Sequence, residues 1–355
     1  MGLLRYKTYN GIRATRRWVF PYLNSRIYKD DFRPILCYLY TEWNCNIDCH
    51  YCFQYDNKMP GMTLETAKSS VDWLKTIGCR VIALMGGEPL LRKDFVLEVI
   101  QYGEENGFFM YLPTNGYLMD KEFIDEVGSA GVAAINLAVD CVSPRKGLPK
   151  ALLTIEPQFR YLVEQQKKYG YILFFNINIC RNNLKDVKLL TEIAHQNHIG
   201  TDYHLIEPPK DFVEIDHYTH HDNTLGITQD QYDDLVDLLD WLIDKQRQGW
   251  PMVNSIAHLE TLKERALGHI SSWTCRAGRN GALIRTDGTL SPCFELMCYD
   301  NDWGRIWEPR FAEEELEKAK EKCQPVCSST CFHTMDHYYN LQTIPEWIRK
   351  HIRVG

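Results

Sequence analysis

The stretch ILCYLYTEWNCNIDCHYC, residues 35–52, joins a predicted β-strand to three closely spaced cysteines. Cys45, Cys49 and Cys52 follow the strand directly, and ligand sites in parallel α/β folds collect at the carboxyl ends of strands. Three thiolates can hold three corners of a [4Fe–4S] cluster and leave one iron open to a small molecule. A structural zinc site would need a fourth ligand, which His50 could supply. Either alternative makes this loop a predicted metal site.

Five more strand-like segments follow, and a helical pattern separates each from the next. In one such pattern, Thr63 starts a predicted helix that Gly78 ends. The strands are almost continuously apolar, which is typical of a sheet covered on both faces. Six β-then-α units predict a parallel sheet, either as a barrel or as an open doubly wound sheet. The five segments are residues 80–85, 108–113, 133–139, 171–179 and 203–207.

The sequence changes character in its last third. A polar, His-rich stretch, residues 211–227, precedes two predicted helices at 228–248 and 256–268. After them, GALIRTDGTLSPCFE, residues 281–295, predicts two short strands around an Asp287–Gly288 turn. An acidic–basic helix at about 311–322 and a second group of cysteines complete the tail. We place a domain boundary near residues 250–270.

The composition narrows the class of protein. The chain has 355 residues, a net charge of −7 and 13 cysteines. The mild charge does not indicate a nucleic-acid partner. The chain is too long for a small disulfide scaffold, and its grouped cysteines indicate metal binding rather than disulfides. Without a signal peptide or an apolar run of about 18 residues, we expect a reducing cytoplasm. The four isolated cysteines, predicted to be buried small apolar residues, are Cys37, Cys79, Cys141 and Cys180.

The cysteine loop resembles the C-x3-C-x-φ-C signature of radical S-adenosylmethionine (SAM) enzymes, with Tyr51 as the aromatic residue. The resemblance implies a partial (β/α)6 TIM-like barrel over roughly residues 33–210. It also implies that the open iron binds the amino and carboxylate groups of SAM. Reductive cleavage would release methionine and a 5′-deoxyadenosyl radical that abstracts hydrogen from a substrate. The electron would come from a donor such as flavodoxin or ferredoxin.

MGGEPLL, residues 85–91, is similar to the GGEP motif of that family. Gly86 and Gly87 would let the backbone approach a ligand closely, and Pro89 would fix the turn. Glu88 could accept a hydrogen bond from the SAM ammonium. For Thr114 and Asn115 an ordinary turn is the alternative. The cofactor contacts that the resemblance implies are Tyr51, Gly86, Gly87, Glu88, Pro89, Thr114, Asn115, Asp140 and Asn176.

The tail resembles the SPASM and twitch extensions of some radical SAM enzymes, through the spacing Cys275-x12-Gly288-x4-Cys293. It departs from the full SPASM pattern, because a C-x2-C pair is missing and no cysteine follows Cys331. Counting Cys298, the tail has six cysteines, whereas two fully ligated clusters need eight. We therefore expect one auxiliary [4Fe–4S] cluster, with a structural zinc site as the alternative. The expected ligands are Cys275 and Cys293 with two of Cys323, Cys327 and Cys331.

These observations divide the chain into three expected parts: residues 1–32, 33–250 and 251–355. The first is basic and aromatic; it could rest on an anionic membrane surface or pack across the bottom of the barrel. The second is the barrel, and the third is the twitch- or SPASM-like extension. Several polar residues near the last strand could orient a substrate or simply be solvated: Asp202, His204, Glu207, His217, His220 and His221.

The expected function is that of a radical SAM enzyme acting on a small molecule. Net oxidation in natural-product, cofactor or lipid biosynthesis would suit an auxiliary cluster. The alternative enzyme is a SPASM-type peptide or protein maturase. Only about 32 residues precede the first strand, which favours a small-molecule substrate over a leader peptide. A different class, a non-catalytic iron–sulfur or zinc scaffold, would produce no 5′-deoxyadenosine.

Overall fold

The structure, a computed structural model, describes most of the chain. The described residues are 12–13, 15–28, 31–52, 55, 57–206, 225–267, 269, 273–297, 302–323, 327, 329–343 and 345. In these ranges no helix has the length and apolar character needed to cross a membrane. Five residues singled out in the sequence lie outside the described residues: Glu207, His217, His220, His221 and Cys298.

One curved sheet organises the molecule, with strand order β6-β5-β4-β3-β2-β1-β7-β8. The first six strands are parallel and follow one another along the chain. This confirms the predicted α/β fold with a partial barrel. The sixth strand begins at Gly200, three residues before its predicted start. The six strands are β1 (Leu36–Glu42), β2 (Val81–Gly86), β3 (Phe109–Thr114), β4 (Ala134–Ala138), β5 (Ile172–Ile179) and β6 (Gly200–Leu205).

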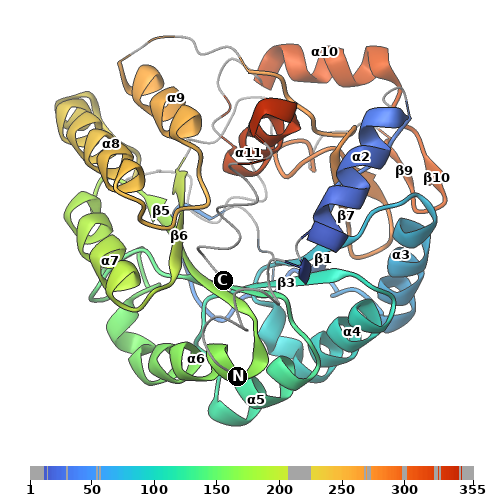
Figure 1. Ribbon diagram of the computed structural model, residues 1–355, viewed down its shortest axis with the longest axis horizontal. Helices are drawn as coiled ribbons and strands as arrows, with labels where there is room; N and C mark the ends of the chain where they lie inside the picture. Colours follow the sequence, from blue (N-terminus) through green and yellow to red (C-terminus); the bar gives the residue numbers. More distant parts are fainter. Residues whose placement is uncertain are drawn as a thin grey trace.

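Helices cover the outer face of the barrel (Figure 1). Thr63 caps the first of them, because its hydroxyl accepts a hydrogen bond from Thr66 N at 3.1 Å. Gly78 follows this helix with φ +85°, as predicted for its end. The helices are α3 (Leu64–Thr76), α4 (Lys93–Glu105), α5 (Lys121–Ser129), α6 (Glu156–Tyr169), α7 (Leu184–Gln196) and α8 (Tyr232–Arg247). Short 3₁₀ turns are η2 (Pro89–Arg92), η3 (Leu152–Thr154) and η5 (Gln229–Gln231).

The predicted hairpin in the tail extends the barrel sheet. β7 (Gly281–Ile284) pairs in parallel with β1, and β8 (Leu290–Ser291) pairs antiparallel with β7. Gly288 takes φ +83° in the turn between them. A small second sheet follows, with β9 (Gly304–Arg305) and β10 (Glu308–Pro309). Because β7 hydrogen-bonds to β1, the tail continues the barrel sheet, and the division at residue 250 stays a prediction.

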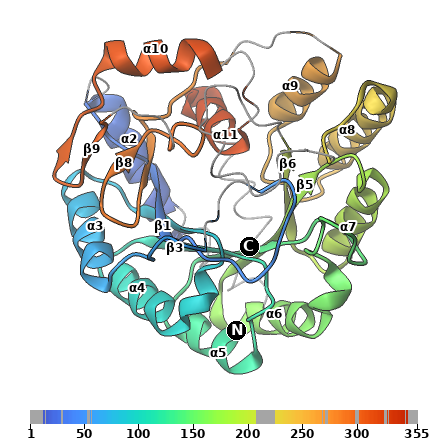
Figure 2. The same ribbon diagram turned by 180° about the vertical axis from the view of Figure 1, so that it is seen from behind.

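Helix α11 (Thr330–Tyr339) fills the open side of the partial barrel, between β6 and the added hairpin (Figures 1 and 2). On one side Thr330 Oγ1 donates a hydrogen bond to Tyr203 O at 2.9 Å. On the other, Gly281 has no side chain, and a Cβ there would lie 2.8 Å from Met335 and 3.0 Å from Phe332. The tail also contains α9 (Ile256–Ala266), α10 (Glu313–Cys323) and η7 (Leu341–Thr343).

The N-terminal segment packs against the amino end of the barrel through η1 (Thr15–Val19) and α2 (Phe20–Ile27). The Trp18 ring meets the edge of Phe109, at the start of β3, with centroids 5.9 Å apart. Tyr22 Oη donates a hydrogen bond to Tyr339 O at 2.9 Å. For its described residues, this segment therefore follows the alternative that packs it across the barrel. The four isolated cysteines are fully buried, as predicted.

Candidate functional site

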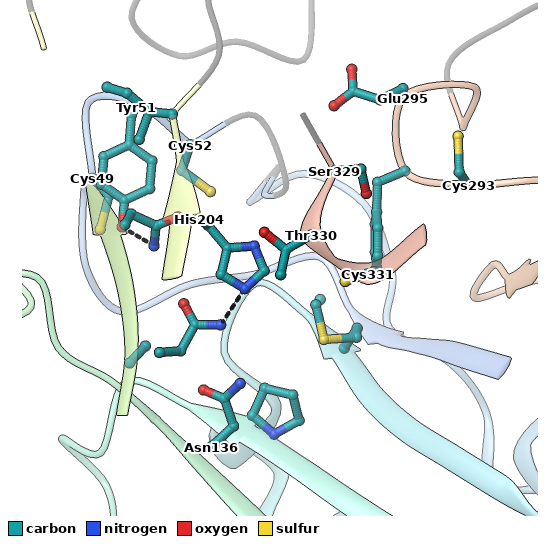
Figure 3. Close-up of a pocket in the computed structure, with 18 of the residues that line it drawn as sticks. Cys49, Tyr51, Cys52, Asn136, His204, Cys293, Glu295, Ser329, Thr330 and Cys331 are labelled. Carbon is teal, nitrogen blue, oxygen red and sulfur yellow. Dashed lines mark hydrogen bonds between the residues drawn. The ribbon is translucent and has the colours of Figure 1, made fainter. Parts of the chain in front are cut away.

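A cavity of about 260 Å³ lies at the carboxyl ends of the strands. Figure 3 shows Cys49, Tyr51 and Cys52 on one side and Cys293 on the other, with His204 between them. The fold thus brings both cysteine groups to one cavity although more than 220 residues separate them. The predicted ligands that line it are Cys45, Cys49, Cys52, Cys275, Cys293, Cys323, Cys327 and Cys331.

The two glycines of the GGEP turn hold the start of the cysteine loop. Gly87 N donates to Glu42 O and Glu88 N donates to Asn44 O, both at 2.8 Å. A Cβ on Gly86 would lie 2.1 Å from Glu42 O, and one on Gly87 would lie 2.2 Å from Asn44 O. The glycines line the cavity, as expected for a ligand-binding turn. Their close contact, however, is with the chain that leaves β1.

Glu88 is a buried carboxylate, 1% exposed, at the edge of the cavity. It accepts hydrogen bonds from Thr114 Oγ1 at 2.7 Å, Asn115 N at 2.8 Å and Leu90 N at 3.0 Å. Burial raises its pKa, and these donors oppose the shift. A carboxylate has about four lone-pair positions, so three donors leave about one position for a donor in the cavity. This fits the predicted contact with an ammonium group.

Thr114 and Asn115 line the cavity, but most of their hydrogen bonds are to other residues of the protein. The Thr114 hydroxyl donates to Glu88 and accepts from Gly116 N at 3.1 Å. Asn115 Nδ2 donates to Asn46 Oδ1 at 2.8 Å, within the cysteine loop. Both side chains therefore brace Glu88 and the loop, and direct contacts to SAM stay a prediction.

Tyr51 and Asp140 form a buried pair behind the cysteine loop. The Tyr51 hydroxyl donates to Asp140 Oδ2, and Asn178 Nδ2 donates to the same hydroxyl at 3.1 Å. Burial and the Asp140 carboxylate raise the pKa of Tyr51 well above its ordinary value. Asp140 is fully buried and is not among the described residues that line the cavity. Its geometry fits the positioning of Tyr51 better than the predicted contact with SAM.

The remaining predicted contacts, Asn176 and Pro89, both line the cavity. Asn176 Nδ2 lies 3.2 Å from His204 Nε2 (Figure 3). Pro89 starts the short 3₁₀ turn η2, for which Glu88 is the capping residue. The turn thus orients the Glu88 backbone and side chain together.

Lys150 is a lining residue that the sequence analysis missed. Its ammonium lies 5.4 Å from the centroid of the Tyr51 ring. Burial alone would lower the pKa of Lys150, but Cys49 and Asp140 outweigh this and raise the pKa above its ordinary value. A cation therefore stands beside the three cysteines. No local pattern marks Lys150, because it belongs to the long connection after β4.

His50 does not join the cysteines. Its backbone N–H donates to Gly147 O at 3.1 Å. Its ring packs against Gly147 so closely that a Cβ there would lie 2.7 Å from His50 Cγ. Among the described residues, no three His, Cys, Asp or Glu side chains converge closely enough to hold a single metal ion. The thiols of a mononuclear zinc site converge on one atom, whereas a [4Fe–4S] cluster spreads its ligands over different irons. The choice between a cluster and zinc stays a prediction.

The tail cysteines separate into two environments. Burial raises the pKa of Cys293, and Cys275, Cys323 and Cys327 add to this as neighbouring thiols. Burial also raises the pKa of Cys331, to about 12, but its neighbours are the Tyr38 hydroxyl and the Asp202 carboxylate. Cys275, Cys323 and Cys327 therefore lie near Cys293, whereas the charged and hydroxyl neighbours of Cys331 are Asp202 and Tyr38.

Part of the chain is similar in sequence to a known family and to characterised enzymes. Residues 44–177 match the Radical SAM superfamily. The AdoMet-dependent heme synthase of Methanosarcina barkeri is 28% identical over 160 residues, 43% of this chain and 44% of that protein. GTP 3',8-cyclase of Mannheimia succiniciproducens is 30% identical over 151 residues, 40% of this chain and 44% of that protein. The chain thus spans less than half the length of these curated relatives.

Solved structures support the fold over most of the chain. Streptococcus suis SuiB bound to S-adenosylmethionine has a TM-score of 0.59 at 16% identity, covering 82% of this chain and 66% of that chain. Native anSMEcpe with bound AdoMet has a TM-score of 0.58 at 17% identity, covering 91% and 100%. At these identities the likeness concerns the fold alone. Residues 44–177, from the cysteine loop to β5, thus match the Radical SAM superfamily in sequence, and the solved structures add a shared fold over most of the chain.

Proposed function

We propose that this protein reductively cleaves SAM and uses the resulting 5′-deoxyadenosyl radical to abstract hydrogen from a small molecule. Enzymes of this superfamily use SAM and a [4Fe–4S] cluster, and the chemistry that the cluster supplies is one-electron reduction of SAM. One observation carries the proposal: Cys45, Cys49, Cys52 and the GGEP turn line a single cavity.

Different residues of this cavity would bind the cluster, bind SAM and balance charge. The three loop cysteines would ligate three irons and leave the fourth for SAM. Glu88 would accept a hydrogen bond from the SAM ammonium through its remaining lone pair. Lys150 would offset the negative charge of the cysteine thiolates, because the same thiols already raise its pKa. An electron donor of the flavodoxin or ferredoxin type would supply the electron.

We further propose an auxiliary [4Fe–4S] cluster, ligated by Cys275, Cys293, Cys323 and Cys327. These four thiols are neighbours on the wall opposite the cysteine loop. We leave Cys331 out of the proposed set, because the thiols that act on Cys293 do not include it and its own neighbours are Tyr38 and Asp202. Such a tail, residues 251–355, would be of the twitch type, with one cluster. A redox centre on the same cavity favours net oxidation of the substrate as the reaction class.

A peptide or protein maturase is the alternative. Its support is a likeness in fold to S. suis SuiB bound to its precursor peptide SuiA, with a TM-score of 0.61 at 16% identity. The cavity of about 260 Å³ favours a small molecule instead, because a bound peptide needs a long groove for its flanking residues.

Anaerobic reconstitution tests the proposal. We expect about eight irons per chain and 5′-deoxyadenosine after addition of SAM and a strong reductant. An intact first cluster without SAM cleavage would contradict the enzymatic function. About four irons with zinc bound in the tail would contradict only the auxiliary cluster. Cys180→Ala, a change at a fully buried cysteine away from the proposed ligands, serves as the matched control.

A further inference from the structure

A second cavity, also of about 260 Å³, lies inside the barrel. It extends from the proposed SAM site toward the amino end, where Trp18 and Tyr22 of the N-terminal segment line it. The two cavities share several wall residues, so they are adjacent. The shared residues include Met85, Pro113, Asn136, Asn176, His204 and Cys331. Each cavity alone is small for a ligand pocket, but together they fall within the usual range of about 300–1,000 Å³.

The wall of this inner chamber is mainly apolar. TIM-type barrels usually fill their interior with bulky side chains. Here Ala134 of β4 contributes only a methyl group, and α11 closes the barrel in place of further strands. The chamber can therefore hold an apolar group of a ligand. Its apolar wall includes Leu36, Val81, Phe109, Ile172, Phe174 and Met335.

Two buried acceptor atoms lack a partner in this chamber. Asn136 is 3% exposed; its Nδ2 donates to Tyr111 Oη at 2.8 Å, while its Oδ1 has no partner among the described residues. Asp202 is 7% exposed; its Oδ2 lies 3.3 Å from His204 Nε2, while its Oδ1 likewise has no partner in the described part of the chain. Buried polar atoms are normally hydrogen-bonded, so these two indicate a missing donor.

We propose that the substrate has an apolar body that fills the inner chamber and an uncharged or cationic hydrogen-bond donor, a hydroxyl or an ammonium, that reaches Asn136 or Asp202. This inference rests on the proposed function and names its substrate class. Both open atoms are acceptors, and one belongs to a carboxylate, so an anionic group is disfavoured. The carbon next to the donor then lies toward the wall that the two cavities share, near His204.

Binding of three simple probes to the holoprotein tests the inference. The probes are 1-octylamine, 1-octanol and octanoate, which share a chain and differ in the terminal group. We expect the amine and the alcohol to bind at least about tenfold more tightly than octanoate, measured by calorimetry or equilibrium dialysis. Equal affinity for all three would overturn the donor requirement. No binding of any probe would overturn the chamber as a binding site.

Substitutions in the chamber test whether the probes bind there. Ala134→Phe places a ring in the chamber and should weaken binding of the amine and the alcohol at least about tenfold. Asp202→Asn should remove any preference for the amine over the alcohol. Leu189→Phe, at an exposed position of α7, is the control and should leave binding unchanged. Full binding by Ala134→Phe would place the probe elsewhere and overturn the inference. If that variant does not fold, Ile172→Phe alters the paired position on β5.

The same samples separate this inference from the proposed function. SAM cleavage without probe binding would overturn the chamber and leave the function standing. Probe binding that Ala134→Phe removes, in a holoprotein that does not cleave SAM, would support the chamber and contradict the function. Iron content and circular dichroism establish that each variant is folded and loaded.

Discussion

The two cysteine groups line one cavity but are built in different ways. Cys45, Cys49 and Cys52 lie on a single loop, whose start is held by hydrogen bonds to the GGEP turn. The tail group draws on separate segments: Cys275 precedes β7, Cys293 follows β8, and Cys323 ends α10. The three loop cysteines are kept near one another by their spacing in the chain, whereas the tail thiols come together only once the hairpin and helices have packed. The changes below are expected to affect the two groups separately.

The largest effect should come from the loop group. Changing Cys45, Cys49 and Cys52 together to Ala removes all three proposed ligands of the first cluster. We expect SAM cleavage to be abolished and the iron content to fall by about four per chain. Iron analysis and quantification of 5′-deoxyadenosine measure both. Cleavage at the wild-type rate would contradict the assignment.

Removing a ligand from the tail group should remove iron without abolishing SAM cleavage. Cys293→Ala should lower the iron content by about four, while the first cluster still supports SAM cleavage. Cys331→Ala is the matched comparison. Cys331 lies near Tyr38 and Asp202 and is outside the proposed ligand set, so this change should leave all irons in place. Loss of about four irons from Cys331→Ala would show that it is a ligand after all.

Gly87→Ala tests how the loop is held. The added methyl group would lie 2.2 Å from Asn44 O, so the chain leaving β1 must move. Displacing a site by about 1 Å can cost roughly 100-fold in rate, so we expect SAM cleavage to slow about 10- to 100-fold. Gly107→Ala, at a position with φ +83° and no neighbour within 4 Å, should lower stability but slow cleavage little. Equal rates for the two variants would contradict this explanation.

Lys150→Met should shift the reduction potential of the first cluster only. A nearby cation stabilises the reduced, more negative form of a cluster, so removing it should make the first cluster's reduction potential more negative. Lys150→Arg keeps the charge and should restore most of the shift. Potentiometric titration followed by electron paramagnetic resonance separates the two clusters. An equal shift in both would mean that Lys150 does not act locally.

The smallest effect should come from the isolated cysteines. Cys141 is fully buried in a small apolar cluster with Leu148 and Cys180. Cys141→Ala should cost about 1 kcal/mol in the free energy of unfolding and leave iron content and SAM cleavage unchanged. Thermal unfolding measures the first quantity. A loss of iron would add Cys141 to the metal sites.

Most of the sheet could be predicted because its strands are apolar runs. Five of the six barrel strands lie within one residue of their predicted ends. The exception is β6, whose first residues include Thr201 and Asp202. These polar side chains are buried in the fold, so the apolar pattern started only at Tyr203. A buried polar residue at a strand start is invisible to a hydrophobicity pattern.

The candidate site was predicted where its residues are close in sequence. Spacing located the three-cysteine loop, and the family resemblance pointed to the GGEP turn. Neither indicated that Gly86 and Gly87 contact the chain leaving β1. Lys150 and Asn136 were missed, because each reaches a cavity only through strand register and a long connection. Their neighbours are distant in sequence, so no short pattern could reveal them.

The sequence by itself determined that Cys45, Cys49 and Cys52 share one loop after a strand, since an eight-residue spacing confines them whatever else folds. It also determined the hairpin around Asp287–Gly288, because a turn of this type is a local preference. Only the tertiary structure decided which tail thiols are neighbours. Pairing of β7 with β1 and packing of α11 into the open side of the barrel bring Cys275 and Cys293 together and turn Cys331 toward Tyr38.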